Sequence, residues 1–151
     1  MTRIRLFPYL AALLALVATS ALHSQADLRA TLFASADEAL ARARAADAEL
    51  LAPGTFTRGL EEYASAESDF TRGRNMDRIR NVLATAARTF GEASDAAEIA
   101  SVTLAAVVKT RADATNANAA TFATELWTEA SEQFTAAARR LCCSRRNAST
   151  G

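Results

Sequence analysis

The chain has 151 residues, 50% of them hydrophobic, and its 17 basic residues balance its 17 acidic ones. This length is enough for one domain with a hydrophobic core but not for two independent ones. Two cysteines are too few for a disulfide-rich scaffold, and the balanced charge excludes the strongly basic surface that nucleic acids and anionic membranes attract.

The N-terminal segment, residues 1–26, has the composition of a secretory signal peptide. Arg3 and Arg5 precede an apolar run over residues 6–18, and Ser24 and Ala26 supply small side chains at the positions a signal peptidase reads. We therefore expect residues 1–26 to direct export, giving a periplasmic or secreted protein without an integral membrane span. An uncleaved anchor is the alternative, although the run is short for a span of about 20 residues.

Cleavage after residue 26 changes the chemistry of the mature chain. It removes His23, the only histidine, so the mature protein cannot use imidazole as a base or as a metal ligand. It also removes two arginines, which leaves 15 basic and 17 acidic residues and a net charge of −2. We expect no nucleic-acid partner.

The composition of the mature chain predicts helices throughout. Proline and glycine are sparse, while alanine, leucine, glutamate and arginine fill the intervals between them. We expect residues 27–141 to form one all-α domain, an antiparallel bundle of three to four helices with one long central helix over about residues 75–113. The apolar pattern stops after Leu141, and residues 142–151 are expected to be a disordered tail.

The first two helices are separated by proline. Ser35 and Glu38 have the spacing of a capping box at a helix start, although a start as early as Leu28 is also compatible with the pattern. This helix is expected to end near Leu51, because Pro53 has no backbone amide. The second helix then carries the largest apolar side chains. They are Phe56, Leu60, Tyr63 and Phe70.

The strongest pattern lies in the central helix. A turn over residues 72–75 supplies Asn75 as its N-cap, and apolar residues then recur at steps of three and four. They are Met76, Ile79, Leu83, Ala86, Phe90, Ala93, Ala97, Ala100, Leu104 and Val107. Such a seven-residue repeat requires a nearly parallel helical neighbour, and Gly91 is the one place where the helix is expected to bend.

The last helix follows a break at residues 115–118 and carries a final apolar stripe. The stripe comprises Phe122, Leu126, Ala130, Phe134 or Gln133, Ala137 and Leu141, with Trp127 beside it. The segment 63–71 matches segment 127–135, with Tyr63 aligned to Trp127, which suggests two copies of a helical unit; chance similarity between alanine-rich helices is the alternative.

The cysteines do not predict a metal or redox site. Cys142 and Cys143 are adjacent, so they form a strained ring, remain free thiols or bond to another chain, and they cannot connect distant segments. Two sulfurs without histidine fall short of the four ligands of a zinc site. We expect neither a metal nor a cofactor.

The sequence contains no enzyme motif. There is no nucleophile elbow, phosphate-binding loop or dinucleotide-binding glycine pattern, and the acidic residues alternate with serine on outward helix faces. We therefore expect no catalytic residues and no enzyme. A glycan-cleaving enzyme would need a buried acid, for which Glu62 and Glu129 are the candidates.

The aromatic residues of the mature chain have two interpretations. As core residues they hold the bundle together. Alternatively, five of them line a groove that admits an apolar ligand or a partner helix. They are Phe56, Tyr63, Phe70, Phe122 and Trp127.

The order of several short motifs resembles a known family. Residues 42–45 (Arg-Ala-Arg-Ala), residues 51–53 (Leu-Ala-Pro), Tyr63, Ala66 and a turn at Gly73 precede an alanine-rich helix. This resembles the alanine-rich periplasmic helical domain of unknown function that bacterial envelope proteins join to an OmpA-type peptidoglycan-binding domain. The resemblance covers residues 36–140.

The resemblance implies an envelope location and a role as a spacer or scaffold. We expect the partners to be an envelope protein or a second copy of the chain, and peptidoglycan to be contacted only through an OmpA-type domain that this sequence does not contain. The leading hypothesis is an exported, non-enzymatic helical scaffold of the bacterial cell envelope. The second hypothesis is a helical binding module for an apolar ligand or a partner helix.

Overall fold

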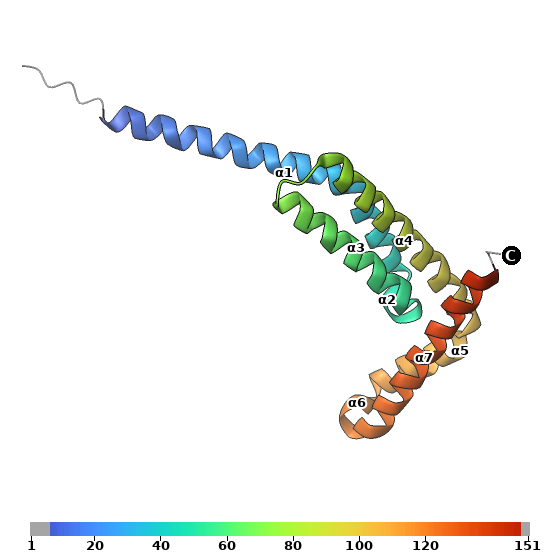
Figure 1. Ribbon diagram of the computed structural model, residues 1–151. Coiled ribbons are helices and arrows are strands. Elements are labelled where there is room, and N and C mark those ends of the chain that lie inside the picture. The colour runs from blue at the N-terminus through green and yellow to red at the C-terminus, as the bar shows by residue number, and fades with distance from the viewer. Residues whose placement is uncertain (1–6, 149–151) are drawn as a thin grey trace, which may run out of the picture. The chain divides into compact units, whose positions relative to one another are not determined.

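A computed structural model describes the backbone of residues 7–148 and the side chains of residues 26–140 (Figure 1). All secondary structure in these described residues is helical, which confirms the predicted all-α class. The helices are α1 (Phe7–Ala45), α2 (Ala48–Leu51), α3 (Pro53–Thr71), α4 (Met76–Thr103), α5 (Ala105–Asn116), α6 (Ala119–Phe122) and α7 (Thr124–Ala148).

The chain divides into two compact units, residues 1–34 and residues 35–151. In the first unit the Arg29 guanidinium lies over the Phe33 ring, 4.6 Å from the ring centre. Nearly all side chains of the expected signal peptide lie outside the described residues. Within the part that is described, none of the helices combines the length and the apolar composition needed to span a bilayer.

The helix that was expected to begin near Ser35 or Leu28 begins and ends elsewhere in the structure. The capping-box residues Ser35 and Glu38 lie inside α1, because the alanine, leucine and arginine around them continue the helix. The helix ends at Ala45, and Asp47 adopts a left-handed conformation (φ 54°, ψ 33°) that aspartate tolerates better than most residues. The predicted stop before Pro53 is confirmed, since Pro53 is the first residue of α3.

Helices α3 and α4 form a helical hairpin. Arg58 Nη2 pairs with Glu92 Oε2 at 3.0 Å, and Arg78 Nε donates to the mostly buried Asp69 Oδ2 at 2.8 Å. The start of α3 therefore lies beside the middle of α4, and the end of α3 lies beside the start of α4, as in a hairpin (Figure 1).

The turn between α3 and α4 has the predicted chemistry. Gly73 has a φ of 63°, which glycine adopts without the penalty that a Cβ would add. The Asn75 side chain accepts hydrogen bonds from the amides of Asp77 and Arg78, so the predicted N-cap is confirmed.

The apolar stripe of α4 is buried over most of its predicted length. Ile79, Leu83, Ala86, Phe90, Ala93, Ala97 and Ala100 are buried. Met76 at one end and Val107 beyond the other are exposed. The three- and four-residue spacing therefore identifies the face that α4 presents to the core.

The predicted long helix over 75–113 is divided at Leu104 into α4 and α5. Leu104 has a φ of −105° and a ψ of 17°, although its amide still donates to the carbonyl of Ala100 at 2.8 Å. Just before it, the Ser101 hydroxyl donates to the Glu98 carbonyl and the Thr103 hydroxyl donates to the Ile99 carbonyl. Such backbone bonds from serine and threonine bend helices, which the prediction did not take into account.

Phe90 lies at the centre of the core. It is fully buried, and its ring centre is 5.8 Å from that of Phe56 and 6.5 Å from that of Tyr63. Opposite it on α3 is Gly59, where an added Cβ would lie 2.7 Å from Phe90 Cε1. The absence of a side chain at this position allows α3 and α4 to approach closely.

Gly59→Ala is expected to lower the free energy of unfolding by about 1–3 kcal/mol, because the new methyl group overlaps the Phe90 ring. Gly91→Ala is the matched control, since nothing lies within 4 Å of a Cβ there. It should raise the free energy of unfolding by about 0.5–1 kcal/mol through helix propensity. Urea unfolding followed by circular dichroism measures both, and equal effects would contradict the close approach.

The C-terminal helices depart from the prediction at one boundary. The predicted break at residues 115–118 is confirmed, because α5 ends at Asn116 and α6 begins at Ala119. The backbone from Cys142 to Ala148 is helical and belongs to α7, whereas a disordered tail was expected over residues 142–151. The side chains of Cys142 and Cys143 lie outside the described residues.

The backbone repeats itself in the two halves of residues 35–148. Asn118 has a φ of 56° and a ψ of 35°, within a few degrees of the angles of Asp47. Ala123 (φ −139°, ψ 51°) likewise matches Ala52 (φ −135°, ψ 48°). Each left-handed residue ends a long helix, and each alanine separates one helical turn from the next long helix.

The hydrogen bonds around these residues repeat in the same alignment. The Phe56 amide donates to the Ala52 carbonyl at 3.0 Å, and the Trp127 amide donates to the Ala123 carbonyl at 2.9 Å. The structure therefore aligns Trp127 with Phe56, whereas the sequence comparison aligned it with Tyr63. The two alignments differ by about two turns of helix, so both place matching side chains on the same face.

Asn118→Ala is expected to lower the free energy of unfolding by about 1 kcal/mol, because alanine tolerates the left-handed conformation poorly. Asn118→Gly should be neutral or slightly stabilising. Asn116→Ala, at an exposed helical position, is the control. Thermal unfolding measures all three, and equal effects of the alanine and glycine variants at residue 118 would argue against a left-handed Asn118.

Candidate functional site

The five aromatic residues predicted to line a groove lie in two environments. Phe56 is buried and Tyr63 is half-buried, and both contact Phe90 in the core. Phe70 is half-buried on α3. Phe122 on α6 is 83% exposed, and Trp127 on α7 is half-buried.

An apolar groove of about 270 Å³ lies between α5 and α7. Small residues and larger apolar side chains both line it. The lining residues are Val107, Thr110, Arg111, Ala114, Ala119, Ala123, Leu126, Trp127, Ala130 and Phe134. Leu126 is 71% exposed and Val107 is 49% exposed, so much of this apolar surface faces solvent.

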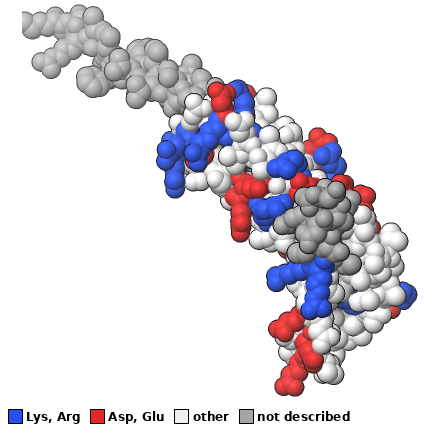
Figure 2. All heavy atoms as spheres, turned by 45° about the vertical axis from the view of Figure 1, so that its right-hand side comes forward, with Lys and Arg blue, Asp and Glu red and all other residues white. Residues whose placement is uncertain are grey.

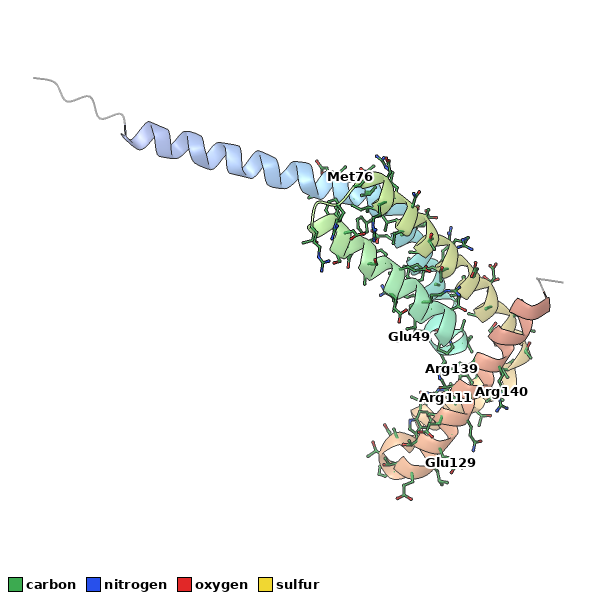
Figure 3. The ribbon with its side chains drawn as sticks, in the orientation of Figure 1. Glu49, Met76, Arg111, Glu129, Arg139 and Arg140 are labelled. Atoms are coloured by element: carbon green, nitrogen blue, oxygen red, sulfur yellow. The ribbon has the colours of Figure 1, made fainter. Side chains whose placement is uncertain are left out.

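Arg111 is the one charged residue among those that line the groove. Its guanidinium lies 4.8 Å from the ring centre of Trp127 and 5.3 Å from that of Phe134. Its Nη1 also donates to Ser131 Oγ at 3.0 Å. Arg111 thus extends from α5 toward α7, on which the labelled Glu129, Arg139 and Arg140 lie (Figure 3). It places one positive charge in an otherwise apolar groove.

Trp127 was predicted from the sequence to belong to such a site, whereas Arg111 was not. An arginine within a helix is normally solvated, so its position over two aromatic rings had no signal in the local pattern. The structural alignment of the two repeats pairs Arg111 with Leu40, a buried residue of the core. This pairing indicates that Arg111 lies on the packing face of its helix.

The two acids considered for catalysis do not form a cluster. Glu62 is half-buried, and its Oε2 accepts a hydrogen bond from Thr89 Oγ1 at 2.6 Å. Glu129 is exposed on α7 and accepts from Gln133 at 3.2 Å. Each acid therefore has a structural partner on a helix surface or at its edge.

Among the described residues, no three His, Cys, Asp or Glu side chains lie together in a group that could hold a metal ion. Basic and acidic side chains are interspersed over the face shown in Figure 2. Lys109, the single lysine, is exposed and pairs with Asp113 at 2.7 Å. On the face in Figure 2, basic side chains are interrupted by acidic ones rather than gathered into one basic patch.

Comparison with family models, with curated proteins and with solved structures finds no match. The resemblance to an alanine-rich periplasmic domain therefore stays a prediction from the sequence.

Arg111→Ala is expected to increase the quenching of Trp127 fluorescence by acrylamide, because the guanidinium that covers one face of the indole is removed. Trp127 is the only tryptophan, so the emission reports on this groove alone. Lys109→Ala removes a neighbouring cation whose charge is already paired with Asp113 and should leave the quenching unchanged. Equal quenching in the three proteins would contradict the stacked position of Arg111.

Proposed function

We propose that the chain is an exported, non-enzymatic helical scaffold of the bacterial cell envelope, which holds its partners by packing helices together. The observation that carries this proposal is the apolar groove between α5 and α7. A surface of this composition favours contact with another macromolecule, because burying it removes apolar side chains from water.

The proposal includes the finer architecture expected from sequence, an antiparallel bundle of three to four helices. The α3–α4 hairpin supports it, since Arg58 pairs with Glu92 and Asp69 pairs with Arg78. Close packing also requires small side chains at the contact face, and α4 carries alanine at four buried positions. They are Ala86, Ala93, Ala97 and Ala100.

The envelope location depends on the N-terminal segment. Its support is the order of Arg3, Arg5, the apolar run over residues 6–18 and the small residues Ser24 and Ala26. The non-enzymatic role draws support from Glu62 and Glu129, which bond to neighbouring helix side chains rather than to each other.

A binding module for an apolar ligand or a partner helix is the second candidate function. The exposure of Leu126 and Phe122 favours it, because neither side chain is covered in the described structure. A scaffold and a ligand carrier differ in what occupies this surface inside the cell.

The export proposal is tested with the full chain carrying a C-terminal tag in a Gram-negative host. We expect the tag in the periplasmic fraction and a mature N-terminus at Asp27. Leu13→Arg, which places a charge in the apolar run, should retain the uncleaved protein in the cytoplasm. Uncleaved protein in the cytoplasm without this substitution would contradict export.

The scaffold and the ligand carrier are separated by a photocross-linking residue at position 122 and by native mass spectrometry of the same preparation. For a scaffold, irradiation cross-links the protein to another protein, and native mass spectrometry before irradiation gives the mass of the polypeptide alone. A ligand carrier gives added mass from a small molecule and no protein adduct, and this second result would replace the scaffold proposal.

A further inference from the structure

Within one chain, the helical unit occurs twice, and comparing the first copy (α1–α3) with the second copy (α5–α7) identifies the uncovered surface of the second. The α1–α2–α3 segment and the α5–α6–α7 segment share one backbone path, in which Asp47 corresponds to Asn118 and Ala52 to Ala123. In the first copy α4 packs on this path and buries Phe90 against it. Among the described residues, only α5, α6 and α7 line the groove; α2, α3 and α4 also contact α7, and Phe134 at the groove is buried in the core with Phe56 and Phe90.

The groove residues correspond to core residues of the first copy. Four pairs illustrate this correspondence. They are Val107 with Ala36, Ala114 with Ala43, Leu126 with Thr55 and Trp127 with Phe56. All four residues of the first copy are buried, whereas Val107 and Leu126 are exposed. The groove is therefore the counterpart of the surface that α4 covers in the first copy.

We propose that this groove is a docking site for one amphipathic α-helix of a partner protein. The partner helix carries small apolar residues at the three- and four-residue spacing of α4, together with a carboxylate that faces Arg111. This inference rests on the proposed role as a helical scaffold and specifies the class of partner that it holds.

The charge of the groove favours a different protein over a second copy of this chain. Arg111 lies within the groove, and the residues that line the groove include no carboxylate. Two copies packed groove to groove would bury two guanidinium groups with no opposite charge between them, which is unfavourable. A partner helix with an acidic residue beside its apolar stripe pairs with Arg111 instead.

The shape of the groove sets the size of one partner residue. Phe90 of α4 fits against Gly59, and the equivalent of Gly59 in the second copy is Ala130. A Cβ at Gly59 would lie 2.7 Å from Phe90 Cε1, so the methyl group of Ala130 excludes a phenylalanine at the same register. The partner therefore carries a smaller side chain at this position.

The test uses the full mature chain and two synthetic peptides with the sequence of α4, residues 76–103. One peptide keeps the phenylalanine of position 90, and the other carries Phe90→Ala. The emission of Trp127 follows binding, and a shift to shorter wavelength indicates burial of the indole. We expect the Phe90→Ala peptide to bind about tenfold more tightly than the unchanged peptide.

Ala130→Gly is expected to reverse this preference, because it recreates in the second copy the space that Gly59 provides in the first. Ala136→Gly is the matched control, since residue 136 is exposed on α7 and does not line this groove. It should leave the preference for the Phe90→Ala peptide unchanged. An unchanged preference in Ala130→Gly would overturn the proposed register.

Leu126→Glu is expected to abolish the fluorescence response, whereas Val102→Glu, which charges another exposed apolar position, should retain it. Arg111→Leu gives position 111 the residue found at its counterpart, Leu40. The peptide should still bind, but its affinity should no longer depend on salt, because the guanidinium that pairs with the carboxylate is gone. Salt dependence that survives in Arg111→Leu would contradict the proposed carboxylate contact.

The absence of any Trp127 response up to about 1 mM peptide would overturn the proposal, since a covering helix of this size should bind more tightly. If the protein sediments as a dimer and Leu126→Glu converts it to a monomer, the groove would instead be assigned to a second molecule of this chain. Binding of an apolar dye that the peptides do not displace would assign it to a small ligand. Export to the periplasm is measured separately, so either hypothesis can fail alone.

Discussion

The fold depends on the contact between Phe90 and Gly59. Four of the seven buried residues in the α4 stripe are alanine, and Phe90 is the largest of the seven. The ring reaches this position only because α3 has no side chain at residue 59. Phe56 and Tyr63 then surround the ring, which fixes the register of the two helices. The predicted groove lining thus divides between this core and the C-terminal helices.

The features that follow from local chemistry were predictable from the sequence. The stripe of α4 was predicted because apolar residues at helical spacing identify a buried face without knowledge of the neighbour. Asn75 was predicted as an N-cap because its side chain bonds to amides only two and three residues away. Trp127 was identified as a candidate site residue because large aromatic side chains mark surfaces that exclude water.

The features that were not predictable depend on packing or on small conformational preferences. Asp47 and Leu104 interrupt helices between stretches that favour helix on both sides, so composition does not reveal them. The sequence comparison aligned Trp127 with Tyr63, seven residues from Phe56, its partner in the structural alignment. The error arises because a shift of seven residues, about two turns, keeps each residue on the same helix face. Arg111 resembled an ordinary solvated arginine until the structure placed it over Trp127.

The continuity of α4 into α5 at Leu104 has a consequence for how such a chain grows. The amide and carbonyl of Leu104 both keep their helical hydrogen bonds, so α4, the last helix of the first repeat, leads directly into α5, the first helix of the second. No connecting loop is needed between repeats. A gene that duplicates one such block in frame therefore yields a longer protein with an intact backbone at the junction, which makes length an easily evolved property of this architecture.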